Sequence, residues 1–364
     1  MKKKIAVCGN GWNNEFLKIV LSGIRKCADE YNVDIYVFMN YSYEEGVEYK
    51  DIGESNIFRL LDYAKVDGVI LLANSFHLPE EFEYLTGKIK SEKIPAISLE
   101  YQLPEIDFMG SDNYSGMFDL CSHIFNVHEV SRVAYVSGPE DNEENIIRRR
   151  ALEDAMEMRG LTLTPDKIIC GDWNYVEVVK RLPIWLDNQK EFPQAFICAN
   201  DVMAMATCAV LKDRNIRVPK DCIVTGFDHL STARTHNPKI TTVDRNWQDM
   251  GYQSLKQLLK KIEGEEVPNS VLIKSRGIPA KRGNIVRPLI TVTRAQIEAF
   301  LEENKVPHVE DSTNQSDEYT RNLIRHRILP LLGQVLAAPL AQALTGDRGT
   351  VTKFRRQGLY KTGP

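Results

Sequence analysis

Several polar side chains in this sequence carry the functional groups that bind small polyols. Asp228 offers a carboxylate, Asn200 an amide and Arg148 a guanidinium. Each of these groups can engage two hydrogen-bonding partners at once, and every hydroxyl of a sugar or nucleoside is both a donor and an acceptor. These residue types predict a polar clamp for a small ligand, beside which Trp173 would provide a flat apolar platform.

The elements that would position these groups alternate in type along the first 275 residues. Short apolar runs are followed by longer stretches with helical spacing of apolar residues, which predicts strands and helices in turn. Strands of four to eight residues with helices between them are typical of parallel sheets covered on both faces. We therefore expect an α/β fold with two doubly wound lobes. The first series is 4–8, 14–31, 34–39, 56–64, 68–73, 80–91 and 96–99, and the second is 132–136, 143–159, 167–170, 174–186, 195–199, 202–214 and 222–226.

Ligands of such sheets bind beyond the carboxyl ends of the strands, where this sequence is unusually polar. Asp112 and Asp228 follow predicted strands, and both are candidate ligand contacts. The alternative is that each aspartate only caps the next helix, since Asp is a favoured N-cap residue. Arg148 has an alternative too, because Arg148 to Arg150 is a charge run of the kind that usually faces solvent.

The first predicted strand is followed by Gly9-Asn10-Gly11, which resembles the start of a dinucleotide-binding turn. Asn14 stands where the third glycine of that motif belongs, and no acidic ribose partner ends the second strand, so nucleotide binding is disfavoured. Trp12 and Phe16 are candidates for the ligand-facing wall of the first lobe. Their alternative is a place in its core.

Catalysis is poorly supported. Cys121, His123 and His128 lie close together, but two histidines five residues apart do not share a helix face, so we expect a structural role and no metal. The sequence has no phosphate-binding Gly-Lys-Ser/Thr motif and no nucleophile elbow in this body. We expect a binding protein without a cofactor, and not an enzyme.

Charge and cysteine usage indicate the compartment and the partners. The residues after Arg276 carry 13 Lys and Arg against 8 Asp and Glu, a net charge of about +5. Because the whole chain has a net charge of −4, the residues up to Arg276 carry about −9. An acidic body argues against nucleic acid as its partner. Seven scattered cysteines predict reduced thiols, and without a signal segment or an apolar run long enough to span a membrane we expect a cytoplasmic protein with no membrane partner.

Five motifs occur in an order and spacing that resemble the ligand domains of the lac-repressor and purine-repressor class over about residues 3–276. The resemblance implies a two-lobed fold of the periplasmic-binding-protein-like type, with Arg148, Trp173, Asn200 and Asp228 at ligand-contacting positions and Asp112 contributing from the opposite lobe. The motifs are Gly138-Pro139 with Arg148, Ala199-Asn200-Asp201-x-x-Ala204, Val218-Pro219, Gly226-Phe227-Asp228, and Pro238 with Thr241-Thr242-Val243.

The resemblance also implies how such a domain is organised and moves. We expect the first lobe at about 3–126 and 246–268 and the second at about 127–245 and 269–276, with hinges near 113–115, 243–246 and 268–271 and closure around the ligand. Because the first predicted strand starts at Lys4, we expect no helix-turn-helix headpiece and no specific DNA binding. Pairing into a homodimer is a further implication that the residues alone do not establish.

The sequence changes character near Gly277. Residues 277–333, with Thr293-Arg294 and Tyr319-Thr320-Arg321-Asn322, resemble an internal stretch of tRNA(Ile)-lysidine synthetase. An ATP-dependent RNA-modifying enzyme is therefore the alternative function, but that chemistry needs a Ser-Gly-Gly-x-Asp-Ser phosphate loop that the chain lacks, so we expect this small, mainly helical appendage to be inactive. The change of motif and charge predicts a fusion or chimera.

Residues 334–364 resemble no family that we can name. They are rich in glycine and basic residues, which predicts a flexible, solvated tail, with weak RNA contact as the alternative.

Overall fold

The computed structural model describes residues 2–11, 14–40, 55–76 and 79–275, and the backbone of the short strands β11 (Lys281–Arg282) and β12 (Ile285–Val286). Trp12 and nearly all of the predicted C-terminal segments, 277–333 and 334–364, lie outside these residues. The predictions made for them therefore stay predictions.

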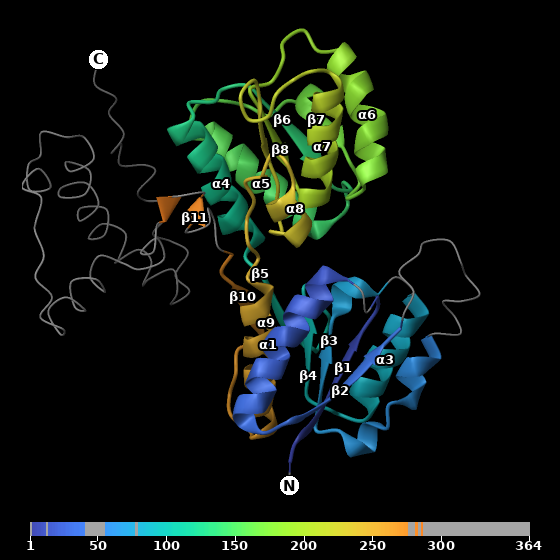
Figure 1. Cartoon of the computed structure of the whole chain (residues 1–364). Coiled ribbons are helices and arrows are strands. Elements are labelled where there is room, and N and C mark those ends of the chain that lie inside the picture. The colour runs from blue at the N-terminus through green and yellow to red at the C-terminus, as the bar shows by residue number, and fades with distance from the viewer. Residues whose placement is uncertain are drawn as a thin grey trace, which may run out of the picture. The chain divides into compact units, whose positions relative to one another are not determined.

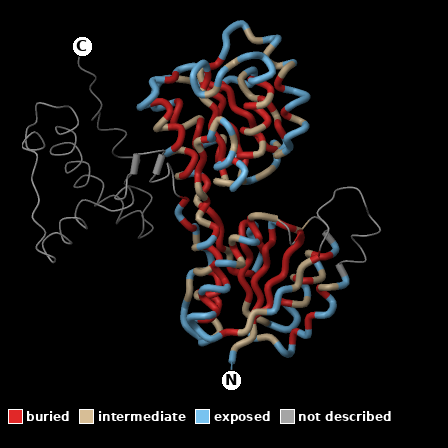
Figure 2. Tube along the Cα trace, in the orientation of Figure 1, coloured by how far each residue is buried: buried red, intermediate tan, exposed pale blue. Residues whose placement is uncertain are grey.

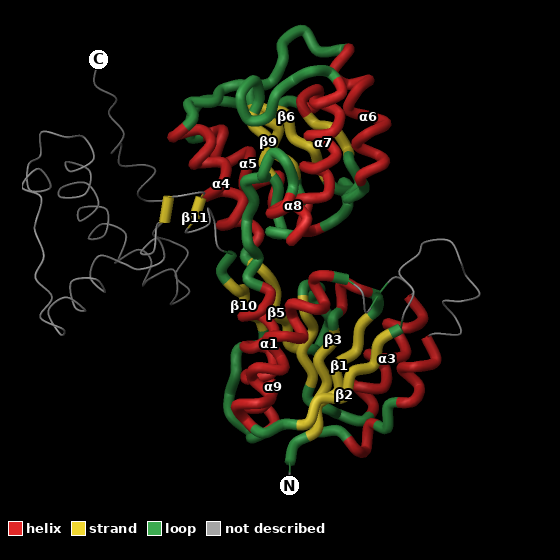
Figure 3. Tube along the Cα trace, viewed as in Figure 1, coloured by secondary structure: helices red, strands yellow, loops and turns green. Residues whose placement is uncertain are grey.

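The first lobe is built on a six-stranded parallel sheet (Figures 1 and 3). The strand order places β1 between β3 and the edge strand β2, so the order reverses at β1, as in a doubly wound sheet. In spatial order the strands are β10 (Ser270–Ile273), β5 (Asp107–Ser111), β4 (Ala96–Leu99), β3 (Gly68–Leu71), β1 (Lys4–Gly9) and β2 (Asp34–Met39).

Alternate residues of β1 face opposite layers of the first lobe, because successive side chains of a strand point to opposite faces. Ile5 and Val7 pack with α1 (Glu15–Tyr31) and α9 (Trp247–Ile262), which lie side by side on one face (Figure 1). Ala6 and Cys8 belong to the other layer, with the 3-10 helices η1 (Ser55–Leu60) and η2 (Tyr63–Lys65) and with α3 (Pro79–Ser91). The single α-helix predicted over 56–64 is thus two 3-10 segments.

The second lobe has a four-stranded parallel sheet in the order β7 (Ile168–Cys170), β6 (Val133–Ser137), β8 (Ala195–Cys198), β9 (Ile223–Thr225). Every residue of β6 and β8 is buried, as expected for central strands covered on both faces (Figure 2). The helices are α4 (Asn113–Val127), α5 (Glu143–Glu157), α6 (Tyr175–Asp187), α7 (Asp201–Asp213) and the short α8 (Ser231–Thr235). The predicted α/β fold with two parallel-sheet lobes is confirmed.

Two lobe assignments made from the sequence are wrong. Helix α4 was placed in the first lobe, but Leu120 and Phe125 belong to the same hydrophobic core as β6 and β8. Residues 269–276 were placed in the second lobe, but β10 pairs with β5 of the first sheet. The predicted hinge at 268–271 therefore overlaps the start of a paired strand.

Both described connections between the lobes and the end of β10 come together around Gly116 in α4. A Cβ atom on Gly116 would lie 2.9 Å from both the Ser275 and the Val243 side chains, so the residues that follow β10 and those that precede α9 touch the helix that starts at the first connection. The amide of Asp112 also donates to the Ile273 carbonyl at 2.8 Å. These segments therefore lie in contact where the lobes join.

Among the described residues, no helix combines the length and the apolar character needed to cross a membrane.

Candidate functional site

Arg148 is a deeply buried basic residue of the second lobe, with 1% of its side chain exposed. Its helix, α5, begins at the Asn142 cap, and Arg148 lies on the buried side of this helix. The guanidinium donates through Nε to Asn113 Oδ1 (3.0 Å), through Nη1 to the Ala199 carbonyl (2.7 Å) and through Nη2 to Glu144 Oε2 (2.7 Å). The alternative that Arg148 belongs to a solvent-facing charge run is therefore wrong.

The guanidinium of Arg148 is also enclosed by aromatic rings. It lies 4.1 Å from the ring centroid of Phe227 and 5.4 Å from that of Trp173, both within the range of cation–π attraction. Trp173 follows β7 with a positive φ of 56°, and its indole covers Gly138, where a Cβ atom would lie 2.4 Å from the ring. The absence of a side chain at Gly138 thus creates the space that the indole of Trp173 occupies.

Arg245 is a second buried guanidinium, in the connection that leads to α9, and it contacts both lobes. Towards the first lobe, its Nε donates to Ser111 Oγ at 3.1 Å and its Nη2 pairs with Glu100 Oε1 at 2.8 Å. Towards the second lobe, it donates to both carboxylate oxygens of Glu144 and, at 3.4 Å, to Asp228 Oδ1. One side chain therefore links the polar ends of the two sheets.

Glu100 anchors the first-lobe side of this cluster. It follows β4 with a φ of 60°, an uncommon value for a glutamate, and its carboxylate accepts from the amide of Ser111 (2.9 Å) and from the indole Nε1 of Trp247 (3.2 Å). Buried acceptors need such donors, since an unpaired carboxylate in this setting would be strongly destabilising. Glu100 is thereby held in place for Arg245.

Asp228 and Asp201 share the second-lobe side of the cluster. Burial raises the pKa of Asp228 to about 6, although Arg148, 3.9 Å from its carboxylate, and Arg245 oppose the shift. Burial, reinforced by the charge of Asp228, raises the pKa of Asp201 to about 8. At neutral pH Asp228 is largely ionised and Asp201 is largely protonated.

Replacing Asp201 by asparagine is expected to flatten the pH dependence of stability between pH 6.5 and 8. A carboxyl group with a folded-state pKa of about 8, above the unfolded value of 3.8, keeps its proton in the native state while the unfolded chain is ionised. Stability therefore falls as pH rises, by at most about 1.4 kcal/mol per pH unit, until the pH passes the folded-state pKa. Asparagine does not titrate and removes this slope.

Thermal unfolding midpoints across this window measure the slope. Asp187→Asn is the control, because Arg214 lowers the pKa of that exposed carboxylate and it stays ionised from pH 6.5 to 8. A D201N variant with the wild-type slope would show that Asp201 is ionised in the folded protein.

Two predicted ligand contacts are helix caps. Asp112 Oδ1 accepts from the amide of Ser115 (2.9 Å) at the start of α4, and Asn200 Oδ1 accepts from the amide of Met203 (2.8 Å) at the start of α7. The capping alternative is thus correct for the Asp112 oxygen that makes this bond, whereas the cap at Asn200 was not predicted and Asp228 does not cap α8, whose N-cap is Leu230. Both caps nevertheless adjoin the cluster, since Asn113 and Ala199, their chain neighbours, accept from Arg148.

Phe16, by contrast, is a core residue. It is 6% exposed and packs edge to face on Trp247 with ring centroids 5.1 Å apart, within the first-lobe core. The prediction that it lines the ligand-facing wall is therefore corrected, because α1 turns this side chain towards α9. Trp12 lies outside the described residues.

Glu100, Glu144 and Arg245 were not predicted from the sequence. Each had a weak signal: Glu144 stands four residues before Arg148 on a predicted helix, Glu100 directly follows a predicted strand, and Arg245 falls in a predicted hinge. None of these signals indicates that the three side chains contact one another.

The cysteine and histidine group forms no metal site. Cys121 is a buried free thiol, and the rings of His123 and His128 contact each other with centroids 5.1 Å apart. Among the described residues, no group of three His, Cys, Asp or Glu side chains is placed to hold a metal ion. All seven cysteines are unpaired, as predicted.

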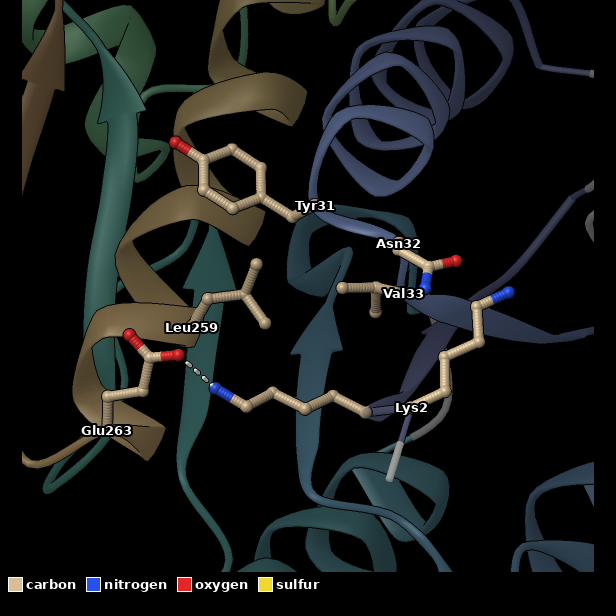
Figure 4. Close-up of a pocket in the computed structure, with 7 residues that line it drawn as sticks. Lys2, Tyr31, Asn32, Val33, Leu259 and Glu263 are labelled. Atoms are coloured by element: carbon tan, nitrogen blue, oxygen red, sulfur yellow. Dashed lines mark hydrogen bonds and ion pairs between the residues drawn. The ribbon is translucent and has the colours of Figure 1, made fainter.

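A cavity of about 400 Å³ lies at the opposite end of the first sheet, near the amino end of β1 (Figure 4). Its cations already have partners: Lys3 pairs with Glu263, and Lys2 pairs with Asp34 at 2.5 Å. Because doubly wound sheets bind ligands at the carboxyl ends of their strands, we assign the site to the Arg148–Arg245 cluster instead. The cavity is lined by Lys2, Lys3, Tyr31, Asn32, Val33, Leu259 and Glu263.

Comparison with known proteins agrees with this architecture. Residues 125–278 match the family described as "Periplasmic binding protein-like domain". The solved transcriptional regulator CelR in its cellobiose complex is similar with a TM-score of 0.61 and 22% identity, over 76% of this chain and 83% of that one. The Lac repressor bound to ONPG is similar with a TM-score of 0.59 and 19% identity, over 76% of this chain and 80% of that one.

Curated relatives are transcriptional regulators. The repressor CytR of Escherichia coli K12 is 23% identical over 214 residues, which are 59% of this chain and 61% of that protein, so the match spans about three-fifths of the relative. The regulator RegA of Clostridium saccharobutylicum is 26% identical over 71% of this chain and 76% of its own length. Residues 125–278 are therefore similar to a periplasmic-binding-protein-like domain, and the chain is similar to these regulators over about three-fifths to three-quarters of its length.

Proposed function

We propose that this chain senses a small polar metabolite, of the sugar or nucleoside class, and does no chemistry on it. The observation that carries the proposal is the cluster in which Arg148 and Asp228 of the second lobe are joined to Glu100 of the first lobe through Arg245. The ligand would bind to the carboxylates at the edge of this cluster, with Trp173 against one of its faces. Such clamps suit hydroxyl-rich molecules.

The contacts between the lobes support a conformational response. Besides Arg245, Glu15 at the start of α1 accepts from the amide (2.8 Å) and the hydroxyl (2.9 Å) of Ser231 at the start of α8. A ligand that competes for Asp228 changes the balance of charges on Arg245, and with it the links between the lobes. Lobe movement about hinges is a common outcome of binding in two-lobed proteins.

The regulators that this chain matches support a regulatory role. We propose that ligand occupancy is read out through the relation of the two lobes, as a signal to transcription. The lysidine-synthetase alternative has no support among the described residues or the reported relatives, so it is not proposed. Homodimer formation stays a prediction.

A thermal-unfolding screen with uncharged sugars and nucleosides tests the proposal. A ligand at 100 times its Kd is expected to stabilise the chain by about 2.7 kcal/mol. Asp228→Asn should weaken binding by roughly 10- to 100-fold, because it removes the charge of the acceptor. Hydrogen bonds to charged groups contribute about 1.5–3 kcal/mol, more than neutral ones. Isothermal titration calorimetry of the same ligand measures the loss.

The control is Asp187→Asn, which makes the same chemical change at an exposed ion pair with Arg214. We expect its affinity to equal that of the wild type. A D228N variant with unchanged affinity would rule out the proposed clamp, and a screen without any stabilising compound would argue against the sensor function.

A further inference from the structure

Glu144 lies between the two buried guanidiniums and binds both. Its two carboxylate oxygens accept from Nη1 and Nη2 of Arg245 as a fork, and Oε2 also accepts from Nη2 of Arg148. Bidentate pairing of this kind is the strongest geometry available between an arginine and a carboxylate. Glu144 therefore occupies the place where an anionic ligand would have to bind.

The carboxylate of Glu144 is held in its ionised form. Burial opposes ionisation, but the charges of Arg245 and Arg148 and the hydrogen bond from Arg245 outweigh it and lower the pKa of Glu144. The side chain thus supplies a permanent negative charge at neutral pH. It neutralises positive charge that would otherwise attract phosphate or carboxylate groups.

Both arginines also donate to other acceptors of the chain. Arg148 donates to Asn113 and to the Ala199 carbonyl, and Arg245 donates to Ser111 and Asp228. These bonds hold the guanidiniums in place as parts of the scaffold. A ligand that bound to the N–H groups used in these bonds would have to displace a partner.

The two arginine side chains are less exposed than two of the three carboxylates of the cluster, whereas Glu100 is 2% exposed. The side chains of Arg148 and Arg245 are 1% and 5% exposed, whereas those of Asp228 and Glu144 are 14% and 23% exposed. Counting Glu100 as well, three carboxylates face two guanidiniums, which leaves one net negative charge. The part of the cluster that a ligand can reach consists of hydrogen-bond acceptors.

We propose that Glu144 determines the specificity of the site, so that it takes ligands which present hydroxyl or ammonium donors and excludes those which present phosphate or carboxylate. The proposal rests on the proposed function, because it assigns the ligand class of that same site. It makes Glu144 an internal substitute for an anionic ligand group.

Replacing Glu144 by alanine tests this directly. The truncation leaves three N–H groups, Nη2 of Arg148 and both Nη atoms of Arg245, pointing at the space that the carboxylate filled. Inorganic phosphate supplies the missing acceptors. We expect the unfolding midpoint of E144A to rise saturably with phosphate, with half-saturation at a concentration at least about tenfold lower than for the wild type at matched ionic strength in chloride.

Glu153→Ala is the matched control. It removes a glutamate of the same helix whose partner, Arg149 at 2.8 Å, is a half-buried arginine outside the cluster. We expect E153A to respond to phosphate as the wild type does. If E144A fails to fold, E144Q removes the charge while keeping the side-chain volume, and a smaller gain in phosphate response, in the same direction, is expected.

Equal phosphate responses of wild type and Glu144 variants would overturn the proposal, as would wild-type binding of cytidine 5′-monophosphate in preference to cytidine. Its failure is distinct from failure of the sensor function. A wild type that binds no uncharged compound, together with an E144A variant that gains phosphate binding, would refute the proposed function and leave the role of Glu144 intact.

Discussion

Arg245→Ala is expected to lower the free energy of unfolding by about 3–5 kcal/mol. The substitution removes the cation that compensates Glu100, Glu144 and Asp228, and it leaves their carboxylates facing one another in a largely buried setting. The loss arises chiefly from these uncompensated charges, since removing one partner of a buried ion pair costs more than the pair itself contributes. Denaturant unfolding followed by circular dichroism measures it.

Arg214→Ala provides the comparison. That arginine pairs with Asp187 at 2.7 Å on the surface, where solvent screens the pair, and the expected loss is much smaller than that of R245A. If R245A were no more destabilised than R214A, Arg245 would not act as the link between the carboxylates of the two lobes. A loss confined to R245A supports the cluster as the structural centre of the site.

Gly23→Ala is expected to destabilise the first lobe by about 3 kcal/mol or more. Helices α1 and α9 approach so closely that a Cβ atom on Gly23 would lie 1.9 Å from the Gln248 carbonyl oxygen, and one on Gly251 would lie 2.1 Å from the carbonyl oxygen of Val20. Both neighbours are backbone atoms, so neither can rotate away. The helices would have to separate, and the apolar layer between them and the sheet would loosen.

Gly87→Ala is the opposite case on helix α3. A Cβ atom there has no heavy atom within 4 Å, so alanine is expected to stabilise the chain by about 0.5–1 kcal/mol through its better helix propensity. Comparing the thermal unfolding of Gly23→Ala and Gly87→Ala separates the effect of close helix packing on stability from the effect of helix propensity. A Gly23→Ala variant as stable as wild type would mean that α1 and α9 do not touch through their backbones.

Much of the local structure was predictable because it depends on neighbouring residues. The strands at Asp34–Met39 and Ala96–Leu99 are apolar runs between polar turns, and they begin and end where the sequence indicates. The cap at Asp112, which was the alternative to a ligand contact, is local as well, since its side chain bonds to an amide three residues later. Helix α4 and strand β10 were assigned to the wrong lobes because a segment near a connection can pack on either side of it.

The sequence by itself determined the alternation of strands and helices, the two-lobed α/β fold and the polar strand ends, because periodicity, capping and turn chemistry act over a few residues. It also singled out Arg148 and Asp228. Only the tertiary structure decided that Arg245 joins Glu144 and Glu100, residues 101 and 145 positions earlier in the chain, and that Phe16 faces the core. Buried charged groups pair with residues that are far away in the sequence, and the pKa of each group depends on all of its partners at once. A local sequence pattern therefore does not indicate these pairs.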